Sequence, residues 1–461
     1  MLERAADVGG TWRDNTYPGC ACDVESHLYS LSFAPEPGWT FRFSRQPEIW
    51  RYLQRLAREF DLLPHIRVRH EVRRAEWDVA ARRWRIDTSG GALTARVLVM
   101  AAGALSEPSV PQLPGLDRFE GRAFHSARWD HTFDMSGERV AVIGTGASAV
   151  QFVPEVQKRA ARLYLFQRTP AWVMPRPDGA IPPWRRRMYG RIPGVQRAVR
   201  LLIYLYREIW IVVFRHPAMM ARVQRMALRH LRRSIEDPIL RSKLTPAYLM
   251  GCKRVLLSND YYPALTQPNV EVVTEPIVEV CARSIVTADG AERPVDAIVF
   301  GTGFRVTDPP LAARIHGRDG RTLKETWAGS PKAHVGTAVA GFPNLFILLG
   351  PNTGLGHNSV VYMTEGQIDH LIAALGHMRA HRIDAIEPTA DAQRSFVSGV
   401  DRRMRGTVWV SGGCSSWYLD RTGRNSTLWP DSSWSYHRRA ARFVAAEYIR
   451  APGVAAAVDV A

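Results

Sequence analysis

The sequence predicts an α/β protein with two similar, mostly parallel sheets. Residues 140–143 are a continuous apolar run suited to a strand buried on both faces, and the turn Gly144-Thr145-Gly146-Ala147-Ser148-Ala149 leads from it into helix-forming residues. Two more apolar runs, 97–103 and 295–303, each end in a small-residue or glycine turn. We therefore expect two Rossmann-like sheets, one closing near residue 103 and one near residue 303.

The strand, glycine turn and helix at residues 140–151 predict a dinucleotide site. Gly144 allows the tight turn, Gly146 lets the backbone approach a pyrophosphate, and free N–H groups at the start of the helix face the phosphates. The next strand, residues 162–166, ends in Gln167-Arg168-Thr169. An NAD site would carry a carboxylate near this point, whereas the cation of Arg168 suits the 2′-phosphate of NADP.

The bulk composition excludes several classes of protein. The chain has 461 residues and a formal net charge of +17. Its arginines run along the whole chain without a concentrated patch that has interleaved aromatics, so no nucleic-acid partner is expected. Genomic base composition is the simplest explanation of the arginine excess, with an anionic cofactor or a membrane surface as alternatives. The five cysteines are odd in number and lack paired C-x-x-C spacing, so neither a disulfide framework nor a metal site is expected.

The N-terminal third predicts a loop, a helix and a hairpin. Residues 9–23 form a glycine-rich loop with two aromatics, a Pro-Gly turn and a terminal Asp23. Composition leaves open both a plain structural loop and a surface that packs on a planar ligand. Residues 46–60 have helical periodicity, and residues 68–86 alternate as two strands. On residue type alone His125 is a structural hydrogen-bonding residue.

The rest of the chain predicts a helical insertion and further strands. Residues 184–250 are rich in arginine and largely helical, and their amphipathic part, 201–214, is too short and too charged to span a bilayer. We favour packing of this part over a substrate pocket and keep a membrane surface as the alternative. Strands are expected at 270–273, 277–280, 284–287 and 342–349, and a helix within 354–375. The tail, 409–436, carries four tryptophans and should cover the site or the core.

Three motifs together resemble the Baeyer–Villiger monooxygenases, which are class B flavoprotein monooxygenases. Residues 119–130 fit F-x-G-x-x-x-H-x-x-x-W-[P/D] in full, ending in Trp129-Asp130, which favours this family over the related N- and S-oxidising enzymes. Residues 9–23 fit a second family motif, from Gly9-Gly10 to Asp23, at every fixed position. The glycine turn at 144–149 follows where the family keeps its NADP motif. The resemblance covers nearly the whole chain.

The start of the sequence, Met1-Leu2-Glu3-Arg4, does not look like a signal peptide, so we expect a cytoplasmic protein. The resemblance implies an enzyme that uses FAD, NADPH and O2 to convert a ketone to an ester or lactone through a flavin C4a-peroxide. It implies that Arg254 stabilises the anionic peroxide and that Asp23 positions Arg254. Lys253, Arg168 and Thr169 would hold the NADP 2′-phosphate. His125 would couple cofactor binding to domain movement. The flavin side would be lined by Glu3 (on the ribose), Gly9, Gly10, Trp12 and Gln46.

The chain departs from the family pattern at its start. Family members have a first G-x-G-x-x-G for the FAD pyrophosphate, and the first βα unit that would carry it does not precede Glu3. We expect a start codon placed about 30 residues too late, a length set by one βα unit, in preference to a truncated copy. The predicted domains are an incomplete FAD-binding part at 1–135, an NADP-binding part at 136–335 with the insertion, and a returning FAD part with the tail at 336–461. N- or S-oxidation and a non-catalytic NADP-binding remnant remain alternatives.

Overall fold

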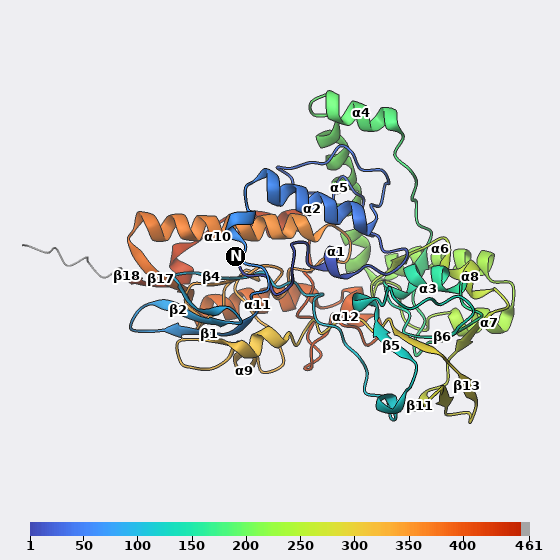
Figure 1. Cartoon of the computed structure of the whole chain (residues 1–461). Helices are drawn as coiled ribbons and strands as arrows, with labels where there is room; N and C mark the ends of the chain where they lie inside the picture. Colours follow the sequence, from blue (N-terminus) through green and yellow to red (C-terminus); the bar gives the residue numbers. More distant parts are fainter. Residues whose placement is uncertain (453–461) are drawn as a thin grey trace, which may run out of the picture.

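A five-stranded parallel sheet forms the centre of one half of the protein. The computed structural model describes residues 1–452 (Figure 1). The strand order is β10-β7-β6-β14-β5, and every neighbouring pair is parallel. The strands are β5 (Arg122–His125), β6 (Arg139–Ile143), β7 (Arg162–Phe166), β10 (Val270–Val273) and β14 (Ala297–Phe300). Parallel strands covered by helices are the expected Rossmann-like arrangement, so the predicted fold class is confirmed.

Steric contacts explain why the turn after β6 contains glycine. Gly144 has φ +110°, and a Cβ there would lie 2.5 Å from the carbonyl oxygen of Gly301, at the end of β14. Gly301 in turn faces the Cβ of Ala149, the first residue of α3 (Ala149–Gln157). Above Gly146, in contrast, the nearest atom to an added Cβ is 3.8 Å away. The turn is therefore closely packed on its sheet side and open on the other.

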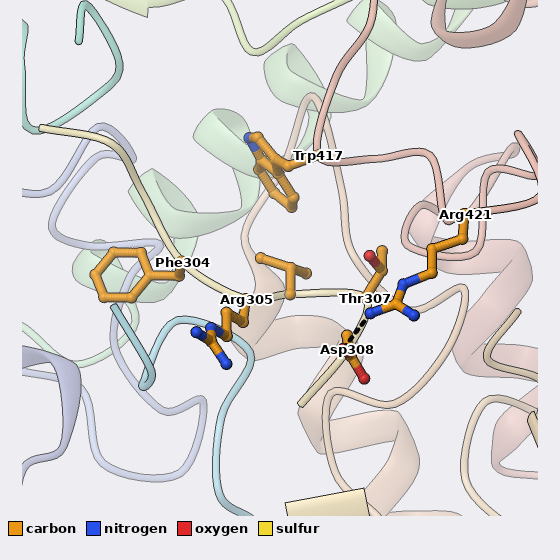
Figure 2. A pocket seen from close by; sticks show the side chains of 7 residues that line it. Phe304, Arg305, Thr307, Asp308, Trp417 and Arg421 are labelled. Atoms are coloured by element: carbon orange, nitrogen blue, oxygen red, sulfur yellow. Dashed lines mark hydrogen bonds and ion pairs between the residues drawn. The ribbon is translucent and has the colours of Figure 1, made fainter. Parts of the chain in front are cut away.

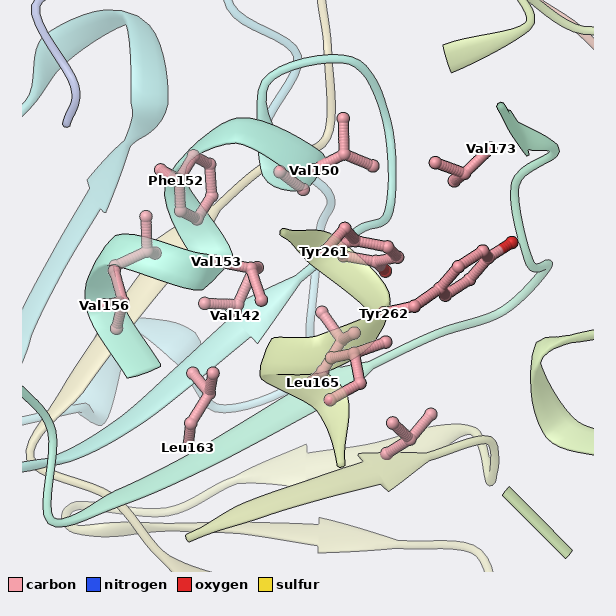
Figure 3. Close-up of a cluster of buried hydrophobic side chains, with 14 of the residues drawn as sticks. Val142, Val150, Phe152, Val153, Val156, Leu163, Leu165, Val173, Tyr261 and Tyr262 are labelled. Atoms are coloured by element: carbon pink, nitrogen blue, oxygen red, sulfur yellow. The ribbon is translucent and has the colours of Figure 1, made fainter. Parts of the chain in front are cut away.

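The core of this half lies between the sheet and its helices. Val142 of β6, Leu163 and Leu165 of β7, and Phe152 of α3 are buried together with Tyr261 of α8 (Tyr261–Leu265) (Figure 3). Residues 295–300 were expected to be a strand, and β14 forms there. β5 precedes the domain boundary predicted at 135–136 and still pairs with β14.

The second half contains smaller sheets. β4 (Leu98–Met100) pairs in parallel with β16 (Leu345–Ile347), so the two apolar runs expected to be buried strands lie side by side. A four-stranded sheet has the order β15-β1-β2-β3. Its strands are β1 (Val72–Asp78), β2 (Arg83–Thr88), β3 (Gly91–Ala95) and β15 (Ile315–His316). The predicted hairpin at 68–86 corresponds to β1 and β2.

Helices cover these sheets, with short strands between them. The helices are α1 (Thr11–Asp14), α2 (Gln46–Glu59), α9 (Leu323–Trp327), α10 (Val360–Ala380), α11 (Ala390–Met404), α12 (Val408–Ser411) and α13 (Ser433–Ala440), with 3-10 turns η1 (Leu63–His65), η2 (Leu116–Arg118), η3 (Ser126–Arg128), η4 (Pro310–Arg314) and η5 (Ala445–Glu447). The remaining strands are β8 (Val173–Met174), β9 (Leu256–Leu257), β11 (Ile277–Val280), β12 (Ser284–Thr287), β13 (Glu292–Pro294), β17 (Ile383–Pro388) and β18 (Tyr448–Pro452).

The predicted insertion is entirely helical where it has regular structure. It comprises α4 (Pro183–Arg191), α5 (Val195–Arg215), α6 (Pro217–Ser234) and α7 (Pro238–Leu244). α4 lies at the outer end of a projection that extends beyond α2 (Figure 1). Among residues 1–452, no helix combines the length and the apolar character needed to cross a membrane.

The tail divides into buried and exposed tryptophans. Trp409 and Trp429 are buried in two separate clusters, as expected for a covering segment. Trp417 and Trp434 are exposed. The expectation that the aromatic tail packs on the protein is therefore confirmed for two of its four tryptophans.

Candidate active site

Asp23 and Arg254 form a bidentate ion pair although they lie 231 residues apart in sequence. The guanidinium Nε donates to Oδ2 of Asp23 at 2.7 Å, and Nη2 donates to Oδ1 at 2.7 Å. The Arg254 and Asp23 side chains remain 27% and 29% exposed, so the protein covers the pair only in part. The pair predicted from the sequence thus exists, with one carboxylate fixing both the position and the plane of the cation.

The pair stays ionised over the neutral pH range. Burial raises the pKa of Asp23, but Arg254, and then Arg207 and Arg176, more than offset this, so the net shift is downward. The Asp23 carboxylate in turn raises the pKa of Arg254. Burial raises the pKa of the neighbouring Tyr418 to about 12, against the opposing effect of Arg254. A neutral tyrosine therefore sits beside a permanent cation.

Two more arginines hold the loop that carries Asp23. Arg207 of α5 donates to the carbonyl oxygen of Asp23 at 3.3 Å and pairs with Glu25 at 2.7 Å. Arg176 donates to the carbonyl oxygen of Cys22 at 3.0 Å. Sequence reasoning missed both residues, and nothing in the arginine-rich composition distinguishes them from the others. The helical insertion thus touches the site directly, which supports the expected packing over it.

Arg168 and Lys253 converge at the end of β7, where the NADP 2′-phosphate was predicted. Lys253 lies over the ring of Tyr248 at 5.2 Å. Burial, and then the charge of Arg168, lower the pKa of Lys253. Neither cation has a carboxylate partner within residues 1–452. The hydroxyl of Thr145 donates to the carbonyl oxygen of Thr169 at 3.0 Å, which ties the glycine turn to the same strand end.

The glycine turn offers hydrogen-bond donors beside these cations. In the described part of the chain, the N–H groups of Gly146, Ala147 and Ser148 have no acceptor, and Gly146 and Ala147 are exposed. Free N–H groups preceding a helix favour anions. The predicted residues Gly144 to Ser148 therefore lie where a pyrophosphate could bind.

The residues predicted for the flavin side lie around α1. Gly9 and Gly10 have positive φ, and an added Cβ at Gly9 would lie 2.6 Å from the Trp50 ring. The side chain of Gln46 donates to the carbonyl oxygen of Trp12. Glu3 accepts from the backbone N–H of Ala5 at 2.7 Å and pairs with Arg13 at 3.2 Å, both through Oε1.

Gln151 of α3 connects the helix after the predicted NADP turn to the 9–23 loop, which is predicted to line the flavin. It accepts from the Tyr17 hydroxyl at 3.0 Å and donates to the carbonyl oxygen of Ala21 at 3.0 Å. Gly19 has φ +79°, and a Cβ there would be 2.6 Å from the Gln151 carbonyl oxygen. The Tyr-Pro-Gly turn of the 9–23 loop is thus fitted against the helix that follows the NADP motif. The sequence reasoning did not single out Gln151.

The 119–130 motif also packs against α3, the helix that follows the NADP motif. Trp129 packs against Phe152 of α3 and Phe124 of β5, with ring centroids 5.4 and 5.3 Å apart. His125 is buried at the end of β5, its Nδ1 accepts from the N–H of Ala127 at 3.1 Å, and burial lowers its pKa. A buried, neutral histidine at the edge of the sheet is compatible with the coupling role predicted for it.

The chain matches the description "Flavin-binding monooxygenase-like" over residues 1–319. A Baeyer-Villiger monooxygenase of Streptomyces coelicolor is 52% identical over 450 residues, covering 97% of this chain and 87% of the relative. One of Pseudomonas aeruginosa is 48% identical, covering 97% and 86%. The chain belongs to the flavin-binding monooxygenase-like family, among the Baeyer–Villiger monooxygenases.

Solved structures of monooxygenases match nearly the whole chain. Cyclohexanone monooxygenase from Rhodococcus sp. Phi1 bound to NADP+ superposes with a TM-score of 0.88 at 28% identity, covering 98% of this chain and 94% of that one. An oxidized steroid monooxygenase bound to NADP has a TM-score of 0.86 at 31% identity, with the same coverage. The chain is thus a flavin-dependent monooxygenase by family.

A disulfide is present in this chain although none was expected. Cys252, just before Lys253 and Arg254, is bonded to Cys414 in the tail, 162 residues away. The expectation from cysteine number and spacing is wrong for this pair, because neither reveals which distant segments the fold brings together. Cys20, Cys22 and Cys281 are free. The bond ties the cation-bearing segment to the loop that holds Trp417 and Tyr418.

We expect the double variant Cys252→Ser/Cys414→Ser to lower the free energy of unfolding by about 2–4 kcal/mol, because the cross-link closes a long loop. Denaturant unfolding without reductant measures the effect, and Cys281→Ser is the matched control. Thiol titration of the unfolded, unreduced protein should find the three free cysteines. Five reactive thiols would contradict the disulfide.

A pocket of about 400 Å³ lies where the chain leaves β14. Its lining includes two aromatic side chains, Phe304 and Trp417, and the ion pair of Arg421 with Asp308 at 2.7 Å (Figure 2). Trp417 is followed in sequence by Tyr418, the neighbour of Arg254. Because open α/β sheets bind ligands beyond the carboxyl ends of their strands, we include this pocket in the candidate site.

Proposed function

We propose that this chain binds FAD and NADPH and inserts one oxygen atom of O2 into a ketone. The balanced reaction consumes the ketone, O2, NADPH and a proton, and forms an ester or lactone, water and NADP+. Bound flavin would supply electron transfer from NADPH and the activation of O2. The observation that carries the proposal is the Arg254 guanidinium, which two hydrogen bonds to Asp23 hold in place at the end of a partly exposed side chain.

The residues present fit NADP. Arg168 and Lys253 offer two cations without carboxylate partners in the described part of the chain, which suits a phosphate dianion. The open space above Gly146 and the free N–H groups beside it suit the pyrophosphate. Thr169 would complete the phosphate contacts from the end of β7. An NADP-bound state of the matched steroid monooxygenase adds support.

The residues that would hold the flavin also fit. An added Cβ at Gly10 would meet nothing within 4 Å, so the loop has open space beside it. The Oε2 atom of Glu3 has no protein partner among residues 1–452 and can accept from a ribose hydroxyl. Trp12 and Gln46 would border the ring system. A matched structure in complex with FAD and NADP supports the same pair of cofactors.

The role of Arg254 follows from charge. Oxygen transfer develops negative charge on oxygen, and a cation fixed before the reaction stabilises that charge without reorganisation. Asp23 keeps the guanidinium in one orientation, so Asp23 acts through Arg254. Tyr418, which stays neutral, lies next to this cation.

The test supplies the purified, flavin-loaded protein with NADPH, O2 and either ketones or a thioether. Ketones should include cyclic, aryl and long-chain members, and products are identified by mass spectrometry. We expect an ester or lactone from at least one ketone, with NADPH consumed in equal amount. Sulfoxide formation with no ester from any ketone would overturn the ketone proposal in favour of heteroatom oxidation.

A further inference from the structure

The outer face of α5 presents a continuous apolar stripe. Leu201, Leu202, Leu205, Tyr206, Ile209 and Val212 are each between 45% and 67% exposed. Their spacing places them along one side of the helix. Large apolar side chains gathered in this way on a surface mark an interaction site.

The inner face of α5 is already used and fixes the helix in place. Gln196 donates to the carbonyl oxygen of Glu36 at 2.6 Å, and Arg200 donates to that of Ser30 at 2.7 Å. Glu208 accepts from Asn358 at 2.7 Å. With these contacts made, α5 cannot rotate its apolar stripe into the protein without breaking them.

In the described part of the chain, arginines without ion pairs lie in α4 and near the start of α5. From residue 179 to residue 235 the sequence contains thirteen arginines and one acidic residue, Glu208. In α4, which contacts α5, no residue is buried and Trp184 is 59% exposed. Within the described residues, no ion pair neutralises the arginines at 185, 186, 187, 191 and 197. α4 stands at the outer end of the projection in Figure 1.

We propose that the outer face of α5, together with α4, is a docking surface for the anionic face of a lipid bilayer. Aliphatic and aromatic side chains enter the interfacial region, and arginines bind anionic headgroups. Charge argues against a second copy as the occupant, because a two-fold interface would set the same arginines against one another. The mainly aliphatic stripe also lacks the aromatic platforms that bind single-stranded nucleic acid. α5 would lie along the surface without crossing it.

Vesicle flotation tests the proposal with the full chain. The probes are phosphatidylcholine vesicles with and without about one-third phosphatidylglycerol, at low and high salt. We expect binding to the anionic vesicles and a strong reduction of it by salt. The double variant Leu202→Gln/Ile209→Gln should weaken partitioning onto the anionic vesicles by at least about tenfold. The triple variant Arg185→Gln/Arg187→Gln/Arg191→Gln should weaken it by about fivefold for each charge lost.

The matched controls are Ile372→Gln on α10 and Val79→Gln, which alter exposed apolar residues elsewhere and should bind as wild type does. Because the altered side chains are exposed, thermal unfolding should stay unchanged in all variants. Absence of binding to anionic vesicles, or binding that both sets of variants retain, would overturn the proposal. Analytical sedimentation provides a further test. If the wild-type protein is a dimer that the double variant Leu202→Gln/Ile209→Gln converts to a monomer, the surface binds a second copy of the chain and the proposal is overturned.

Discussion

Arg254→Ala is expected to lower the rate of ester formation by about 10²–10³-fold, the usual effect of removing one preorganised group that stabilises developing charge. Flavin reduction by NADPH should persist, because the cations that we propose for the 2′-phosphate belong to other residues, Arg168 and Lys253. Single-turnover measurements separate the two steps, with reduction followed anaerobically and product formation followed after mixing with O2.

Two further variants complete this test: Arg254→Lys is the conservative substitution, and Arg283→Ala is the control. Lysine keeps the charge but cannot make two parallel bonds to Asp23, so its rate should fall between those of wild type and the alanine variant. Arg283 is 71% exposed and pairs only at the surface, so its loss should leave the rate unchanged. Full-rate ester formation by Arg254→Ala would remove the role proposed for this residue.

Arg168→Ala and Lys253→Ala should each raise the KM for NADPH by about 10- to 100-fold, since a hydrogen bond to a charged group contributes about 1.5–3 kcal/mol. The KM for NADH, which lacks the 2′-phosphate, should change little. Steady-state oxidation of both nucleotides by each variant measures the difference in preference.

Lys158→Ala is the matched control for the second prediction, because Lys158 is exposed directly after the last residue of α3 and pairs with Glu155. Its preference for NADPH should equal that of wild type. An equal rise in both KM values for Arg168→Ala or Lys253→Ala would indicate general damage to the site, and the assignment of the 2′-phosphate to these cations would fail.

Local patterns predicted the elements well because they depend on neighbours in sequence. The periodic run expected at 46–60 is a helix over Gln46–Glu59, and the strands expected at 270–273, 277–280 and 284–287 have the predicted bounds. The apolar runs at 97–103 and 342–349 contain only three-residue strands, β4 and β16, and the prediction of a buried strand is correct for β16 but wrong for β4, in which no residue is buried. Each of these segments is defined by its own residues.

Contacts between distant segments could not be derived in the same way. The Asp23–Arg254 pair was available only through the family motifs, since neither residue stands out by type. Gln151 and Tyr418 act through hydrogen bonds and packing that appear only once α3, the 9–23 loop and the tail are assembled. The Cys252–Cys414 bond also depends on how distant segments assemble. The same assembly decides that Trp417 and Trp434 are exposed while the other two tryptophans of the tail are buried.

Labelled oxygen tests the central claim most directly. The flavin-loaded enzyme, NADPH and a ketone that it accepts are incubated under ¹⁸O₂, and the product is analysed by mass spectrometry. We expect an ester or lactone that carries one ¹⁸O atom, while the second labelled atom leaves as water. An unlabelled ester, or NADPH consumption that yields only hydrogen peroxide with every ketone, would contradict it.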